Sequence, residues 1–320
     1  MLNLKTVKNR EDFVKIAKAV TNLPYNYIRS ISTEELKNLF IQNCLQGIEN
    51  NHHFLVVEKD SQVMGFASIL KSDWDSKFFN KNIHQVRNLW IQNNDTEVFK
   101  IVMKEIYSYC SKNKTDTIQI NLQYETPFLV QLLEREGFFT TDVHCTYFID
   151  FEKTSINNMD YGNIVLREFV DSDSEYLLQI ARTSYNQDRY HLDPFLPNKL
   201  CDSFYESWIS NSFSGEIADF TVVAELNKIP VGFMTIKYYY NFNNIFSDNI
   251  GTLLLSAVSS AARENGIYSS MIHFCMNWLK ERNCRYIHFG SQVYNIPVQR
   301  TWIGLGFKIG EVNTWLNKWF

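Results

Sequence analysis

Four residues, Arg263 to Gly266, have the types and the position of a phosphate-binding turn. They follow an apolar run, Leu253–Val258, that we expect to be a buried strand. The next segment, Ile267–Lys280, repeats apolar residues at three- and four-residue spacing, which predicts an amphipathic helix. A glycine turn before a helix directs backbone N–H groups and the positive end of the helix dipole at one point, which suits a phosphate. The same spacing is also typical of a plain strand–turn–helix unit, so both interpretations stay open.

Length and composition narrow the classes of protein. The 320 residues exceed the usual single core, and a net charge of -4 spread along the chain gives no basic face for nucleic acid. The N-terminus lacks the apolar core of a signal peptide, and no apolar run is long enough for a membrane span. The six cysteines and seven histidines show no metal-ligand spacing. We therefore expect a cytoplasmic protein with buried reduced thiols, no metal, no nucleic-acid partner and no membrane insertion.

The chain contains an internal repeat. The run Phe54–Val57, which leads to Gly65, matches the run Phe220–Val223, which leads to Gly232, at an offset of roughly 170 residues. Each run belongs to the same succession of expected strands and helices. The sequence therefore predicts an α+β (mixed α/β) protein with two tandem copies of one unit, each a mostly antiparallel mixed sheet flanked by helices.

The polar run 154–162 is the expected linker, which places the two domains at residues 1–153 and 163–320. At the position of the Arg263–Gly266 turn, the first copy has Asn93–Glu97, which is acidic and contains no glycine. A negative loop repels a phosphate, so we expect the first copy to be degenerate. The aromatic and acidic segment Ser72–Phe79 is expected to be a loop.

The second copy resembles the GCN5-related N-acetyltransferase (GNAT) family. The likeness rests on Arg263-x-x-Gly266, on the strand Tyr286–Gln292, and on Asn295 followed by Trp302 and Gly306-Phe307. The resemblance implies that the turn holds the pyrophosphate of acetyl-CoA, and that the strand before it splays from its neighbour to admit pantetheine. The implied cofactor-binding residues are Leu255, Ser256, Val258, Arg263, Glu264, Asn265, Gly266, Ile267, Tyr268 and Asn295.

Three segments resemble, more closely, the TDP-fucosamine acetyltransferase-like enzymes that acetylate nucleotide-linked amino-sugars. They are residues 73–79, residues 188–208 and residues 313–319. The candidate substrate residues are Asp75, Phe79, Arg189, Tyr190, Asp193 and Tyr239, although the tyrosine run at Tyr239 is also typical of a strand edge. An arginine can pair with a substrate phosphate through two parallel hydrogen bonds, although an ordinary surface ion pair is the alternative for Arg189.

The sequence departs from the family signature at two positions. Tyr268 stands where the signature has glycine or alanine, and its bulk would crowd the turn unless the ring points away. Trp302 stands where the family has its general-acid tyrosine, and indole cannot deliver a proton at useful cost. Tyr294 or Tyr190 is then the candidate acid, unless the thiolate leaves unassisted or the site is impaired. His191 titrates near neutrality and is the candidate base, the alternative being a structural turn.

The resemblance implies an acetyl-CoA-dependent N-acetyltransferase, for which we expect no metal and take His191, Tyr294 and Trp302 as catalytic candidates. The expected acceptor is the 4-amino group of a dTDP- or UDP-linked deoxy-amino-sugar, in bacterial surface-polysaccharide synthesis. Another amine, as in an amino acid, an antibiotic or a protein, is the first alternative. A non-catalytic CoA-binding module is the second, and a homodimer is compatible with each.

Overall fold

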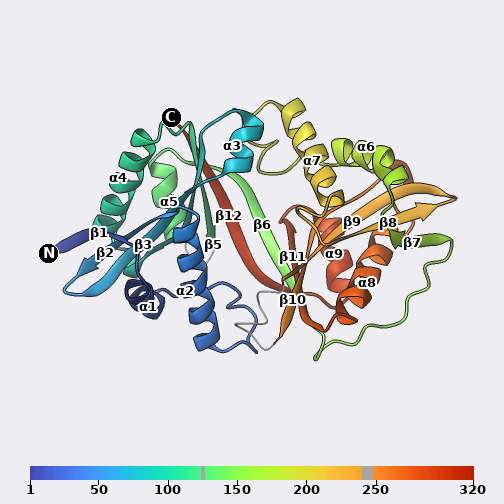
Figure 1. Ribbon diagram of the computed structural model, residues 1–320, viewed down its shortest axis with the longest axis horizontal. Helices are drawn as coiled ribbons and strands as arrows, with labels where there is room; N and C mark the ends of the chain where they lie inside the picture. Colours follow the sequence, from blue (N-terminus) through green and yellow to red (C-terminus); the bar gives the residue numbers. More distant parts are fainter. Residues whose placement is uncertain (124–126, 240–247) are drawn as a thin grey trace. The chain divides into compact units, whose positions relative to one another are not determined.

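The structure is a computed structural model that describes residues 1–123, 127–239 and 248–320 (Figure 1). The chain folds into two compact units: unit 1 comprises Met1–Val143 with Glu311–Phe320, and unit 2 comprises His144–Gly310. This division differs from the expected domain boundaries at both ends of the second half. Residues 144–162, which include the expected linker, belong to unit 2, and residues 311–320 belong to unit 1.

Unit 1 is a mixed sheet with helices packed against it. Its strands are β1 (Leu2–Val7), β2 (His53–Lys59), β3 (Gln62–Lys71), β4 (Ile83–Ile91), β5 (Thr117–Gln123) and most of β12 (Lys308–Trp319). Its helices are α1 (Arg10–Ala19), α2 (Thr33–Glu49), α3 (Asp73–Phe79), α4 (Thr96–Lys112) and α5 (Pro127–Arg135). The strand order is β1-β2-β3-β4-β5-β12, and β4–β5 is its parallel pair.

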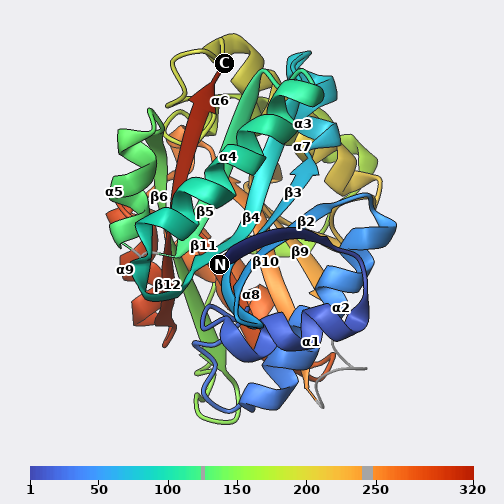
Figure 2. The same ribbon diagram turned by 90° about the vertical axis from the view of Figure 1, so that its left-hand side faces the viewer.

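The core of unit 1 lies between this sheet and α4. Figure 2 shows α4 lying over the strands. Apolar residues recur on one side of α4, and Val98 and Val102 are fully buried. They approach the sheet at Gly65, where an added Cβ would lie 2.7 Å from the Val98 side chain. The absence of a side chain at Gly65 therefore lets the helix pack closely on β3.

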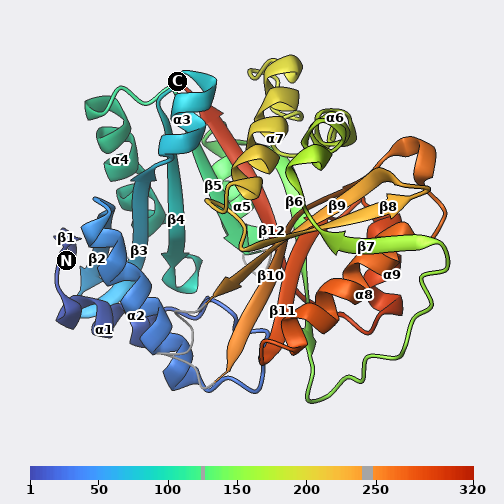
Figure 3. The ribbon, with the colours of Figure 1, turned by 45° about the vertical axis from the view of Figure 1, so that its right-hand side comes forward.

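Unit 2 repeats the same arrangement (Figure 3). Its strands are β7 (Ile164–Glu168), β8 (Phe220–Leu226), β9 (Ile229–Tyr239), β10 (Asn249–Val258), β11 (Cys284–Gln292) and much of β6 (Phe139–Asp150). Its helices are α6 (Ser174–Ser184), α7 (Asn198–Phe213), α8 (Ile267–Lys280) and α9 (Ile296–Gly304). The strand order is β7-β8-β9-β10-β11-β6, and β10–β11 is its parallel pair. The predicted fold class, two tandem α+β copies with mostly antiparallel sheets, is confirmed.

Each unit completes its sheet with a strand from the other half of the sequence. Strand β6 pairs antiparallel with β11, from Tyr286↔Asp150 to Gln292↔His144. Strand β12 pairs antiparallel with β5, from Asn313↔Gln123 to Trp319↔Thr117. Because either strand has a suitable apolar alternation, the hydrophobic pattern alone does not say which sheet it joins. This exchange is why the units differ from the expected boundaries.

The prediction of a loop at Ser72–Phe79 is wrong, because Asp73–Phe79 forms helix α3. Asp75, Ser76 and Phe79 are buried on one side of it, at helical spacing. The Ser76 hydroxyl donates to the Ile83 carbonyl (3.2 Å) and accepts from the Ile83 N–H (3.1 Å). The helix is short and its apolar side is mixed with polar residues, so the periodicity in the sequence is weak.

The strand exchange predicts reciprocal effects of two core truncations. Leu316 on β12 is fully buried in the core of unit 1, whereas Ile149 on β6 is buried in unit 2. We expect Leu316→Ala to destabilise unit 1 and Ile149→Ala to destabilise unit 2, each by about 2–5 kcal/mol. Hydrogen exchange of amides in β3 and in β9 measures the two units separately. If Leu316→Ala lowered the protection of β9 but not that of β3, the assignment of β12 to unit 1 would be contradicted.

Candidate functional site

Strand β10 carries a bulge opposite Thr235 of β9. The register shifts between Leu253 and Ser256, so that two residues of β10 oppose the single residue Thr235. The Thr235 hydroxyl accepts a hydrogen bond from the Leu255 N–H (3.0 Å) and donates one to the Leu255 carbonyl (3.2 Å). Both backbone groups of Leu255, an expected cofactor contact, are therefore bonded to β9.

Beyond this point β10 and β11 separate. Within the described residues, the last pair of their ladder is formed by Thr252 of β10. Both strands continue, β10 through Leu253–Val258 and β11 through Phe289–Gln292, and we call these two stretches the fork. The expected splaying of the strand before the turn is thus present. Ser256 and Val258, two further expected cofactor contacts, lie in the fork.

The turn after β10 has the backbone of a tight loop. Glu264 and Gly266 are left-handed, with φ of 69° and 72°. The Asn265 amide donates to the carbonyls of Ala262 and Arg263, at 3.2 Å each. Arg263 to Gly266 are exposed, and an added Cβ at Gly266 would meet only the Ser269 hydroxyl, at 3.8 Å. The turn therefore leaves open space in front of α8.

Helix α8 begins at Ile267 with Gly266 as its N-cap, and no side chain caps it. The equivalent helix of unit 1, α4, is capped by Asp95, whose carboxylate accepts from the N–H groups of Glu97 (2.9 Å) and Val98 (3.1 Å). An uncapped helix N-terminus presents N–H donors and a positive dipole end to an anion. In unit 1 a carboxylate of the chain occupies the N-terminus of the helix, whereas in unit 2 no side chain occupies it.

The Tyr268 ring is directed toward β10 and α9. Its hydroxyl accepts a hydrogen bond from Trp302 Nε1 (3.1 Å) and also bonds the Ser256 side chain. Burial raises the pKa of Tyr268 to about 12, although these two hydrogen bonds act in the opposite direction. Trp302 is buried and packs edge-on against Phe289 (4.1 Å) and Tyr147 (5.0 Å). The two departures from the family signature are therefore in contact with each other.

Tyr294 and Asn295 form the turn between β11 and α9. Tyr294 is exposed, and its hydroxyl donates to the Gln187 carbonyl, which ties this turn to the loop after α6. Asn295 is the N-cap residue of α9, and its amide donates to the Ser291 hydroxyl (3.0 Å). The Tyr294 proton is therefore engaged by backbone, which does not favour Tyr294 as the proton donor.

His191 has both ring nitrogens occupied. Nδ1 lies 2.5 Å from Asp188 and Nε2 lies 3.2 Å from Asp202, and the side chain is 3% exposed. The ring stacks on Tyr205 of α7. Burial lowers the pKa of His191, but the hydrogen bonds and charges of the two carboxylates outweigh it and raise the pKa overall. This geometry supports the structural alternative, an anchor between the loop and α7, rather than the expected base.

The other expected substrate residues of this loop are partly buried as well. Arg189 bonds the Tyr190 hydroxyl, with its guanidinium 4.4 Å from the centre of the Tyr190 ring. Tyr190 is buried against Phe204 of α7 (4.5 Å). Asp193 is buried and accepts from the Phe195 N–H (3.0 Å). The structure brings these residues together in one ordered turn.

Two histidines near the fork were missed by the sequence reasoning. His288 of β11 pairs with the last β10 residue before the fork and stacks on Tyr239 at 6.4 Å. The His144 ring of β6 lies over Gly290, where an added Cβ would be 2.1 Å from it. Burial lowers the pKa of each histidine to about 4, helped at His144 by the charge of Arg189. His144 approaches β11 only through the strand exchange, which the sequence pattern does not reveal.

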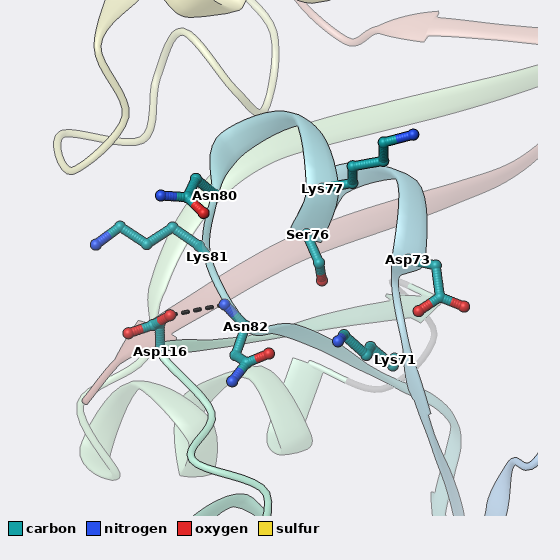
Figure 4. A pocket seen from close by; sticks show the side chains of 8 residues that line it. All are labelled: Lys71, Asp73, Ser76, Lys77, Asn80, Lys81, Asn82 and Asp116. Carbon is teal, nitrogen blue, oxygen red and sulfur yellow. Dashed lines mark hydrogen bonds between the residues drawn. The ribbon is translucent and has the colours of Figure 1, made fainter.

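Asp75 and Phe79, the remaining expected substrate residues, belong to unit 1 and are buried on α3. A surface pocket lies beside the same helix (Figure 4), lined by Lys71, Asp73, Ser76, Lys77, Asn80, Lys81, Asn82 and Asp116. The ammonium groups of Lys77 and Lys81 point in different directions in Figure 4, so they do not converge on one ligand. Neither Asp75 nor Phe79 lines the pocket.

In ranges 1–123, 127–239 and 248–320, no three or more histidine, cysteine or acidic side chains are grouped so that they could hold a metal ion. Over the same ranges, no helix combines the length and apolar character that crossing a membrane requires.

Comparison with known proteins gives a family match over the second half. Residues 176–307 match the model of the acetyltransferase (GNAT) family. The spore coat polysaccharide biosynthesis protein SpsD of Bacillus subtilis (strain 168) is 20% identical over 301 residues, which are 92% of this chain and 98% of the relative.

Two solved structures share the fold. A GCN5-related N-acetyltransferase from Sphaerobacter thermophilus superposes with a TM-score of 0.64 at 12% identity, covering 99% of this chain and 95% of the other. A tandem GNAT protein from the clavulanic acid biosynthesis pathway has a TM-score of 0.57 at 9% identity, covering 100% and 98%. The second of these also supports the tandem arrangement of the two units.

The His191 contacts predict a pH-dependent stability of unit 2. A pKa raised above the unfolded value of 6.5 contributes stability that is complete below that value and is lost as the pH rises through the folded pKa. We expect His191→Phe to lower the unfolding free energy by about 3–5 kcal/mol, because it leaves Asp188 buried without its partner. It should also remove this pH dependence. Denaturant unfolding at several pH values measures both effects.

The matched control is Asp202→Asn. The Asp202 carboxylate lies farther from the His191 ring than the Asp188 carboxylate does, and it is more exposed. This variant should cost less than His191→Phe at every pH. A His191→Phe protein that keeps the stability of the wild type near pH 6 would contradict an anchoring role.

Proposed function

Because the chain carries an acetyltransferase domain of the GNAT family at residues 176–307, we propose that it transfers the acetyl group of acetyl-CoA to a primary amine. We further propose that this amine is the 4-amino group of a dTDP- or UDP-linked deoxy-amino-sugar. Three features support the proposal: the open turn at Gly266, the fork after Thr252, and the nature of the polysaccharide relative.

The observation that carries the cofactor assignment is the difference between the two helix N-termini. Asp95 caps α4 with its own carboxylate, whereas the N-terminus of α8 at Gly266 has no side-chain cap. An anion of the right size completes the second site but is repelled from the first. The residues present therefore fit a pyrophosphate at α8.

Specific residues of unit 2 would hold each part of acetyl-CoA. The N–H groups of the first turn of α8, at Ile267–Ser269, and the exposed Arg263 would bind the pyrophosphate. Pantetheine would lie in the fork, beside backbone groups of Ser256 and Val258 that have no partner strand on the β11 side. Asn295, the N-cap residue of α9, would contact the pantetheine arm, as the family resemblance implies.

The chemistry asks the protein for a neutral amine, a donor for the carbonyl oxygen and a path for the proton. The donor that we propose for the oxygen is a backbone N–H of β10 near Ser256. His144 is neutral because burial and the charge of Arg189 lower its pKa to about 4. A neutral imidazole can accept a proton from the amine nitrogen, which becomes more acidic once it has attacked the carbonyl. We therefore propose His144, rather than His191, as the residue that receives this proton.

The amino-sugar acceptor is supported by the relative and by the loop after α6. The spore coat polysaccharide biosynthesis protein is similar along 92% of this chain. Arg189 in that loop is half-buried and offers a cation for a phosphate, and Tyr239 at the end of β9 offers an aromatic ring for a base. The first alternative keeps the chemistry with a different amine. The second is a CoA-binding module without turnover.

A substrate panel tests the proposal. Thiol release from acetyl-CoA is followed with dTDP- and UDP-linked 4-amino-sugars, free amino-sugars, amino acids and aminoglycosides. We expect release only with the sugar nucleotides. Release with another amine would replace the acceptor, and stabilisation by CoA without any release would indicate a binding module. If CoA at millimolar concentration does not raise the melting temperature, the acetyl-CoA assignment is wrong.

Gly266→Asp predicts the loss of CoA binding. The new carboxylate would cap α8 as Asp95 caps α4, and it would repel the pyrophosphate. We expect the affinity for CoA to fall at least about 100-fold, which corresponds to about 2.7 kcal/mol. Isothermal titration calorimetry measures the change.

Gly215→Asp is the matched control for Gly266→Asp. Gly215 also has a positive φ, of 81°, with no atom within 4 Å of an added Cβ, but it follows α7 instead of preceding a helix. Both variants should lose about 1 kcal/mol of stability, because both place a side chain in a left-handed conformation. Only Gly266→Asp should lose affinity for CoA, and equal losses in both would sink the pyrophosphate assignment.

A further inference from the structure

The contact between Tyr268 and Trp302 has a chemical meaning beyond packing. The two residues lie on different helices, α8 and α9, and the Trp302 N–H donates to the Tyr268 hydroxyl oxygen at 3.1 Å. They are also the two positions at which this sequence departs from the family signature. The chain therefore lacks a phenol at position 302 but has one at position 268, in contact with the residue that replaces it.

That place is the edge of the fork. The Tyr268 hydroxyl also bonds the side chain of Ser256, which lies on β10 within the fork. The Ser256 carbonyl in turn accepts from the Tyr185 hydroxyl at 2.8 Å. If acetyl-CoA occupies the fork, as proposed above, its thioester lies close to the Tyr268 oxygen.

The hydrogen-bond directions leave one proton available. An indole N–H can only donate, so Trp302 uses the Tyr268 oxygen as an acceptor. The Tyr268 hydroxyl keeps its own proton, which it can donate to a third group. The Tyr185 hydroxyl, by contrast, already donates its proton to the Ser256 carbonyl. Of the two phenols, Tyr268 is the one with a proton to give.

We infer that Tyr268 is the general acid of this enzyme and that Trp302 is its positioning residue. As the C–S bond of the thioester breaks, the bonding electron pair goes to sulfur and the Tyr268 hydroxyl proton moves to that sulfur, which gives the free thiol. The resulting phenolate is stabilised by the hydrogen bonds from Trp302 and Ser256. The attacking amine releases one proton to His144, and the phenolate regains a proton when His144 gives that proton up, so that the step balances. This inference depends on the proposed acetyl transfer.

The surroundings of Tyr268 are consistent with this role. Burial raises its pKa to about 12, so the phenol carries its proton throughout the physiological range. The titratable groups that act on it are the hydroxyl of Tyr185 and the thiol of Cys275, both with pKa values raised by burial. Both are neutral, so neither opposes the phenolate by its charge, and the hydrogen bonds from Trp302 and Ser256 stabilise it.

The test compares leaving groups. Tyr268→Phe keeps the ring and removes the proton, so turnover with acetyl-CoA should fall about 100-fold. The acetyl ester of seleno-CoA retains every binding group, but its selenolate leaves without a proton. With this substrate we expect the loss to shrink to about threefold or less. A loss of equal size with both substrates would mean that Tyr268 acts only through structure, and no loss with either would also overturn the inference.

A binding measurement without turnover gives a second readout. The Tyr268 hydroxyl would donate to the thiolate of bound CoA, so the wild type should bind CoA more tightly as the pH rises above about 8.5, the ordinary thiol pKa. Calorimetry should show that Tyr268→Phe loses this increase, while both proteins bind desulfo-CoA equally. Weaker binding of desulfo-CoA by Tyr268→Phe would contradict the inference. If the wild type binds no CoA at all, the proposed function fails first and the inference with it.

Trp302 is tested by moving the phenol back. Trp302→Phe keeps a ring against Phe289 and Tyr147 and removes the N–H, so turnover should fall about tenfold. The double variant Tyr268→Phe with Trp302→Tyr places a hydroxyl on α9 instead of α8. We expect it to recover part of the activity that Tyr268→Phe loses. Tyr185→Phe is the control. Any loss of turnover that it causes should be equally large with acetyl-CoA and with the seleno ester. A double variant as inactive as Tyr268→Phe, with unchanged melting temperature, counts against a transferable acid.

Discussion

The separation of β10 from β11 is the constraint on which the rest of unit 2 depends. Backbone N–H and C=O groups need partners, and a strand that leaves its neighbour must find them elsewhere. The bulge opposite Thr235 solves this on one side, because the Thr235 hydroxyl bonds both backbone groups of Leu255. On the other side, the Tyr185 hydroxyl bonds the Ser256 carbonyl. What remains of the fork is an edge of backbone without a partner strand on the β11 side, which is where we propose that acetyl-CoA binds.

The two units use the same fold with opposite results at one position. In unit 1 a carboxylate belonging to the chain caps the helix after the parallel strand, and in unit 2 a left-handed glycine stands there. The sheets, the strand orders and the parallel pairs are alike. The two copies therefore differ at the N-terminus of this helix, which a carboxylate of the chain caps in unit 1 and which no side chain caps in unit 2.

The sequence was sufficient for features that repeat or that have a strict local cause. The matching runs at Phe54 and Phe220 predicted the tandem copies, and the glycine before α8 predicted the turn. Helix α3 was missed because its buried side mixes Asp75 and Ser76 with Phe79, which hides the apolar period. The place of His191 was missed for another reason: the carboxylate of Asp202 that occupies its second nitrogen comes from a separate helix. His144 became visible only when β6 was found beside β11.

The exchange of β6 and β12 also has a consequence for how the chain is made. Translation delivers β5 early, but the strand that covers its edge, β12, follows only after all of unit 2 has been synthesised. Until then the edge of β5 is an unpaired row of donors and acceptors, and the core of unit 1 lacks Leu316. Domains generally fold in the order of their synthesis. Here the half that leaves the ribosome first is completed last, because the strand that covers its edge is synthesised after unit 2.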